Sequence, residues 1–277
     1  MRILTFGVSL LFVTGAAVWG CGCGKAVREV AKTAEAPAAS DSISTFTLVG
    51  HTETGRKKWE VQGETADLLG ETVHLSPVRA VSFGQVDVRL TAKKGQFHKI
   101  SQDVHLEKDV VVTTSDGARL TTDTLDWVAE REMGKTPDWV TVTRPGMTVV
   151  GKAGIGYPKL KRVRLEREVT VTIQGQTGLT RVTCDGPMEV DYGRRKARFW
   201  RNVRVEDDKG HILSDRLDVV LDPEVNQIAK ATFWGHVRIH RKDQLATANR
   251  ANYWKDTGRM RLIGHPKLAM LPKEYEE

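Results

Sequence analysis

Eight histidines, three cysteines and a recurring series of aspartates are the side chains with which this sequence could do chemistry. His236 and His240 stand four residues apart in a stretch that alternates like a strand, so they share one face. At roughly 3.3 Å per residue they lie about 13 Å apart, too far for a single metal ion. We interpret both as solvent-facing side chains, and we expect neither a metal nor any other cofactor.

The cysteines indicate no redox or nucleophilic chemistry. Cys184 is the only cysteine after residue 23, so the body of the chain has no internal disulfide framework. Its segment, RVTCD, is typical of a strand and has no catalytic partner nearby. We expect a buried, unreactive thiol.

The aspartates recur at one position of a repeated segment, as Asp123 and Asp126 do in one copy and Asp215 and Asp218 in another. Such repetition favours a structural role at strand ends or on outward faces. A polysaccharide-active enzyme would need clustered carboxylates, and this alternative stays open. The sequence has no H-E-x-x-H, C-x-x-C pair, G-x-S-x-G or phosphate-binding glycine loop, so we expect no enzyme.

The elements that carry these residues are repeated strands. FWRNVRV at Phe199 returns 34 residues later as FWGHVRI at Phe233. Related heptads begin at Leu106, Leu165 and Leu262, which makes the unit about thirty residues long. A unit of that length predicts a stacked architecture in which each copy buries its apolar face against its neighbours.

A second repeated segment interleaves with the heptads. It reads TTDTLDW from Thr121 and LSDRLDV from Leu213, with turn signals such as Lys255–Gly258 between the halves. Within the strands the period is two, as in Val203 and Val205, and no convincing helical period follows residue 45. We predict an all-β, elongated stack of antiparallel strands.

Such a stack encloses a continuous apolar trough. If its two layers meet tightly the trough is only a core, and if they splay it can admit an acyl chain. The end strands present unpaired backbone groups that invite strand addition by another chain. The inward series gives these candidate lining residues: Trp59, Val61, Leu90, Leu125, Trp127, Val140, Val142, Val169, Val171, Met188, Val190, Leu217, Val219, Val237, Ile239 and Tyr253.

The N-terminus indicates export and membrane attachment. A basic start, Met1-Arg2, precedes eighteen uncharged residues, Ile3–Gly20. Val18-Trp19-Gly20-Cys21 resembles a bacterial lipoprotein signal, so Cys21 is a candidate for lipidation; an uncleaved helical anchor is the alternative. We assign residues 1–24 to this segment and 25–44 to a linker. The net charge of +7 suits an anionic partner, and export argues against nucleic acid.

Three stretches of the body resemble known proteins. TLVGHTETGRKKWEVQGETADL (47–68) and the segment 90–127, ending ARLTTDTLDW, are similar to LptC. The segment 186–254, with ARFWRNVRV, LSDRLDVVL and ATFWGHVRI, is similar to LptA, or OstA-like, proteins. The chain therefore resembles the periplasmic lipopolysaccharide-export bridge of Gram-negative bacteria. LptC and LptA are familiar as separate chains, whereas this one is long enough for both.

The resemblance implies a β-jellyroll with a V-shaped apolar interior that holds lipopolysaccharide acyl chains. It implies edge-to-edge assembly with like-folded proteins, an inner-membrane ABC transporter complex as partner, and no cofactor or catalysis. The modules are then 45–175 (LptC-like) and 176–272 (LptA-like), continuous with each other, in a periplasmic protein tethered to the inner membrane. A structural or adhesion-type lipoprotein with a closed core remains the alternative.

Overall fold

The fold is all-β, as predicted. A computed structural model describes residues 41–51, 54–84, 86–158, 161–175, 178–222, 228–242 and 244–270, which form eighteen strands and no helix. Nothing within these ranges is a helix with the length and apolarity to cross a membrane. The predicted anchor and Cys21 lie outside the described residues. β1 begins at Asp41, so it includes the last four residues of the range expected as linker, because they pair with β2.

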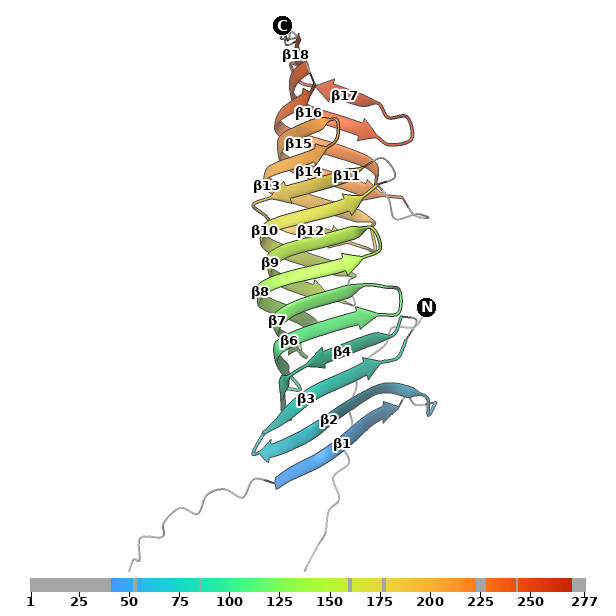
Figure 1. The fold of residues 1–277 in the computed structure, drawn as a ribbon, viewed down its shortest axis with the longest axis vertical. Coiled ribbons are helices and arrows are strands. Elements are labelled where there is room, and N and C mark those ends of the chain that lie inside the picture. Colours follow the sequence, from blue (N-terminus) through green and yellow to red (C-terminus); the bar gives the residue numbers. More distant parts are fainter. Residues whose placement is uncertain are drawn as a thin grey trace, which may run out of the picture. The chain divides into compact units, whose positions relative to one another are not determined.

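The strands follow one another along the chain (Figure 1). Their bounds are β1 Asp41–His51, β2 Lys57–Leu69, β3 Thr72–Ser82, β4 Val88–Ala92, β5 Lys94–His98, β6 Val104–Thr114, β7 Arg119–Val128, β8 Met133–Arg144, β9 Met147–Tyr157, β10 Arg162–Gln174, β11 Leu179–Cys184, β12 Met188–Asp191, β13 Lys196–Asp207, β14 Gly210–Leu221, β15 Ile228–Arg241, β16 Gln244–Trp254, β17 Met260–Ile263 and β18 Lys267–Met270.

Every pairing between strands is antiparallel, and the ladder runs in chain order. Three strand positions are split into two short strands: β4 and β5 both pair with β3 and β6, and β11 and β12 both pair with β10 and β13. At the far end, β17 and β18 share the partner β16. The described ladder therefore has β1 at one edge and the β17–β18 pair at the other.

Four of the five repeated heptads prove to be bends within a strand, and the fifth, from Leu262, spans the connection between β17 and β18. In FWRNVRV the pairing of β13 with β14 shifts between Trp200 and Val203, and Arg201 and Asn202 have positive φ, at 65° and 50°. The sheet folds over at these points, so one layer lies in front of the other in Figure 1. The other heptads carry positive φ at Lys108, Asp109, Glu168, Gly235, His236, Gly264 and His265.

The bend corrects one detail of the sequence interpretation. The period of two does not continue through the heptad, because two residues are used to turn the strand. Phe199 and Val203, four apart, are both buried, but Arg201 midway between them, which a strict period of two would also place inward, is exposed at the bend. Asn and Asp at the turning positions fit the left-handed region, which their short polar side chains tolerate.

Glycines let β9 approach the apolar side chains behind it. A Cβ on Gly151 would lie 2.9 Å from Leu165 Cδ1, and one on Gly154 would lie 3.1 Å from Val140 Cγ2. Gly156, two residues on, has nothing within 4 Å of its Cβ position. The first two glycines are thus required by packing against the interior.

The interior contains two apolar clusters. The large one has twenty buried residues between Val140 in β8 and Ala251 in β16. The small one has four, Val78, Ala92, Leu106 and Val110. Between them, β7 contributes the buried Thr122 instead of an apolar residue.

Candidate functional site

The candidate lining residues all lie on the inward face of the folded sheet. Eleven of the sixteen belong to the large cluster or pack against it: Val140, Val142, Val169, Val171, Met188, Val190, Leu217, Val219, Val237, Ile239 and Tyr253. Val61, Leu90 and Leu125 pack against the small cluster. The remaining two, Trp59 and Trp127, are half-buried and share a face with Val61 and Leu125, two residues away.

Burial within this face falls with distance from the bends. In β10, Val169 beside the bend is 1% exposed, Val171 is 5% exposed, and Ile173 is only half-buried. In β14, Leu217 and Val219 are buried and Leu221 is half-buried. The apolar side chains are therefore closely packed at the bends and partly accessible to solvent toward the strand ends.

Sequence reasoning missed the deepest part of this face. Leu106, Val110, Leu165 and Phe233 are all buried beside bends but were not among the candidate lining residues. The signal was present, since each stands at the first or fifth position of a heptad. A strict period of two is consistent with these positions, since residues four apart lie on the same face of a strand.

The outward face carries the aspartates, in agreement with the structural role expected for them. Asp218 pairs with Arg216 (2.6 Å), and Asp215 lies 2.8 Å from Nδ1 of His236. His236 occupies a bend, so it does not share a regular strand face with His240 as the spacing predicted. His240 instead stacks on His211, with ring centroids 4.6 Å apart.

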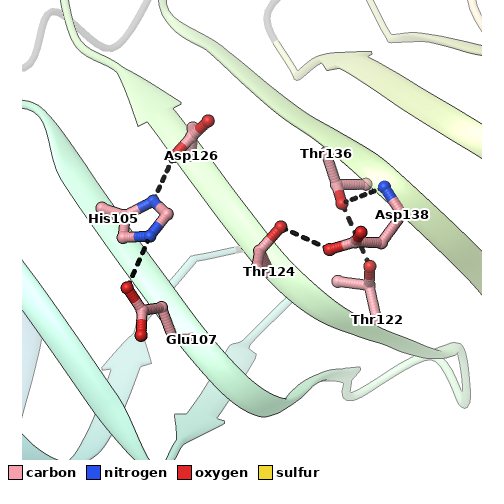
Figure 2. Close-up of polar contacts among 7 residues, drawn as sticks. All are labelled: His105, Glu107, Thr122, Thr124, Asp126, Thr136 and Asp138. Carbon is pink, nitrogen blue, oxygen red and sulfur yellow. Dashed lines mark hydrogen bonds and ion pairs between the residues drawn. The ribbon is translucent and has the colours of Figure 1, made fainter.

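Seven polar residues of β6 to β8 form a cluster of hydrogen bonds and ion pairs, which includes outward, bend and buried positions (Figure 2). His105 lies between Asp126 (Nδ1 to Oδ1, 2.5 Å) and Glu107 (Nε2 to Oε1, 3.0 Å). The hydrogen bond to Asp126 raises the pKa of His105 above its ordinary value. Thr124 donates to Asp138 at 2.6 Å. Among the described residues no three His, Cys, Asp or Glu side chains are grouped so as to hold a metal.

The buried hydroxyls of this cluster occupy the gap between the two apolar clusters. Thr122 and Thr136 are both buried, and their hydroxyl oxygens lie 3.2 Å apart (Figure 2). Thr136 also accepts a hydrogen bond from the backbone N–H of Asp138. These contacts satisfy buried polar groups and bring no nucleophile to a base.

Cys184 is a buried free thiol, as expected from its strand segment. It is 5% exposed within the large cluster, and burial raises its pKa to about 11. A thiol with that pKa stays protonated near neutral pH and is a poor nucleophile.

Two family models match the chain in succession. The model described as "Lipopolysaccharide-assembly, LptC-related" matches residues 24–174, more than half of the 277 residues. The chain belongs to this family. A model described as "LptA/(LptD N-terminal domain) LPS transport protein" matches residues 185–274. The LptC-related match precedes the LptA-type match, as the sequence motifs indicated. A search of curated proteins finds no match.

Family membership gives the chain a role in lipopolysaccharide transport, and Lpt domains are transport and bridge proteins rather than enzymes. The two matched regions share one uninterrupted sheet. The LptC-related match ends at the last residue of β10, and the LptA-type match begins directly after β11. Because β10 pairs with both β11 and β12, the ladder crosses from one region to the other without a gap.

Proposed function

We propose that the chain binds the acyl chains of lipopolysaccharide on its inward apolar face and passes them along the stack, across the periplasm and toward the outer membrane. The observation that carries this proposal is the gradient of burial. An interior that is closed at the bends and half-buried at the strand ends leaves apolar side chains available to a ligand. Ile173, Leu221 and Tyr253 are examples from three separate strands.

Burial of an acyl chain can supply the binding free energy by itself, with no chemical step. Burial of about ten methylenes at about 0.8 kcal/mol each contributes roughly 8 kcal/mol. Because neighbouring strands of the stack present similar apolar surface, an acyl chain can move from one strand to the next without a large change in free energy. Directional movement then needs an external energy source, for which the inner-membrane ABC transporter complex is the proposed partner.

Edge strands are the proposed contact with other bridge proteins of the same fold. β1 and β18 each pair with another described strand on one side only, which leaves backbone groups to pair with a further chain. We place the protein in the periplasm, held at the inner membrane by its N-terminal segment or by lipid on Cys21.

A matched pair of photo-crosslinkers tests the acyl-chain proposal. Ile173 faces inward and is half-buried, and its neighbour Thr172 in the same strand faces outward. With Ile173→p-benzoylphenylalanine in cells we expect adducts to lipopolysaccharide, and with Thr172→p-benzoylphenylalanine we expect none.

Leu221 provides a second inward position that depends on a different strand. If neither Ile173 nor Leu221 gives an adduct, or if Thr172 gives as much adduct as they do, the interior is a closed core. The alternative of a structural lipoprotein without a lipid ligand would then hold.

A further inference from the structure

The outer face of one end of the sheet is strongly basic. It consists of the outward residues on one side of the bends in β13 to β17, from Lys196 in β13 to Ile263 in β17; we call it the basic outer face. Among its described residues Asp218 is the only carboxylate. Its cations are Lys196, Arg198, Arg216, Lys230, Arg250 and Arg261.

Tryptophans alternate with these cations across neighbouring strands. Trp200, Arg216, Trp234 and Arg250 stand in register on β13, β14, β15 and β16. The guanidinium of Arg216 lies 6.0 Å from the centre of the Trp200 ring, and that of Arg250 lies 5.0 Å from the Trp234 ring. Lys230 is placed in the same way over Trp254, at 5.4 Å.

Among the described residues, few carboxylates compensate the charge on this face. Glu189 and Asp191 on β12 lie opposite Arg198 and Lys196, but they pair with arginines outside the face. Asp218 pairs with Arg216, whereas Arg198, Lys230 and Arg261 form no ion pair with any residue that the structure describes. Large apolar side chains are exposed among the cations, since Trp234 and Val220 are each 38% exposed.

The corresponding surface of β6 to β8 is different. There His105, Glu107, Asp126 and Asp138 face outward and satisfy one another or nearby hydroxyls. The excess of cations is therefore a property of β13 to β17 and not of the outer face in general.

We propose that the basic outer face binds the surface of an anionic phospholipid bilayer. Lysine and arginine near such a surface each contribute attraction to phosphate-bearing headgroups. Indole rings favour the headgroup region, where their apolar body and polar N–H are both accommodated. This binding is independent of the acyl-chain site, because it uses the opposite side of the same strands.

The test uses the full chain with Val220→p-benzoylphenylalanine, mixed with vesicles of phosphatidylglycerol or of phosphatidylcholine. The yield of phospholipid adduct at position 220 reports contact of this face, whatever holds the rest of the chain at the vesicle. We expect adducts with phosphatidylglycerol that decrease as salt is raised. Equal yields from the two lipids would overturn the proposal.

Charge neutralisation identifies the responsible residues. The variant Arg198→Gln, Lys230→Gln, Arg261→Gln removes three charges from the face, and about fivefold per charge predicts that the yield of phosphatidylglycerol adduct at position 220 falls roughly 100-fold. The control Arg181→Gln, Arg238→Gln, Lys267→Gln removes three exposed outward charges on the other side of the bends, and should retain the adduct.

Polyglutamate distinguishes a protein partner from a membrane. If labelled polyglutamate binds the full chain, is lost in the first variant only, and no phospholipid adduct forms, the face docks an acidic protein and the membrane proposal fails. The acyl-chain proposal is tested separately, since lipopolysaccharide adducts from a crosslinker at Ile173 should be unchanged in both charge variants.

Discussion

The apolar cluster within β3 to β6 has four buried residues and the cluster within the longer run β8 to β16 has twenty, although β6 carries the same kind of bend as β10, β13 and β15. The bends themselves are equally well filled, since Val110 and Val203, at the same heptad position, are 0% and 1% exposed. The difference arises farther along the strands. Leu90 and Val104 are only half-buried, whereas Val219 and Ile239 are buried.

This comparison separates two requirements of the fold. A bend needs apolar residues at its two ends and residues that accept positive φ between them, and both regions meet that requirement. The depth of the core depends on how closely the two layers approach beyond the bend. We therefore expect β8 to β16 to hold most of the stability and β3 to β6 to adapt more readily to a ligand.

The largest expected difference comes from truncating the first heptad position in each region. Phe233→Ala leaves a cavity within the cluster of twenty and should reduce the free energy of unfolding by about 3–5 kcal/mol. Leu106→Ala, in the cluster of four, should cost about 2 kcal/mol because its surroundings can collapse more easily. Urea unfolding of the full chain measures both, and equal losses would contradict the proposed difference in core depth.

The fold was largely predictable from the sequence because alternation and repetition are local signals. Pairs such as Val203 and Val205 identified strands, and the 34-residue repeat identified the stack. The bends were not predicted, because positive φ at Arg201 or Glu168 leaves no unmistakable mark in the residue type. The gradient of burial was also beyond sequence reasoning, since Val171 and Ile173 differ in burial through the separation of the layers and not through their own chemistry.

The next test of the large cluster is a substitution in β9, where glycines allow the strand to lie close to the interior. Gly151→Ala places a Cβ 2.9 Å from Leu165 Cδ1, and relief of that clash should cost about 1–3 kcal/mol. Gly156→Ala, in the same strand with open space around it, is the matched control and should leave stability unchanged within about 0.5 kcal/mol. Thermal unfolding of the two variants compares them directly. A neutral Gly151→Ala would mean that the layers are loosely packed here.

The boundary between the two clusters can be examined with Thr122 and Thr136. Thr122→Val leaves the buried hydroxyl of Thr136 without its side-chain partner and should cost about 1 kcal/mol. The double variant with Thr136→Val should cost less than the sum of the single changes, because two valines can join the clusters with apolar contact. A double-mutant cycle from urea unfolding gives the coupling. Strict additivity would show that the hydroxyl pair does not connect the two regions.

The smallest expected effect is a difference in pH dependence between the regions. His105 has a raised pKa, chiefly through its hydrogen bond to Asp126, so its stabilisation is complete below the ordinary histidine pKa of 6.5 and is lost as pH rises through the folded value. His211 has a lowered pKa, chiefly because of desolvation, so its protonation destabilises the fold as pH falls below 6.5. Asp126→Asn should remove the alkaline loss, and His211→Asn should remove the acidic loss.

NMR titration of the two imidazoles measures these pKa values directly, and urea midpoints between pH 5 and 9 give the linked stabilities. A folded pKa for His105 at or below that of His211 would contradict the assignment. The opposite signs follow from the surroundings. His105 lies between two carboxylates that favour its charged form, whereas desolvation, the nearby Arg204 and the stacked His240 disfavour the charged form of His211. The sign of each histidine's pKa shift therefore follows the charges on its part of the outer face. Carboxylates prevail on β6 to β8, and cations prevail on β13 to β17.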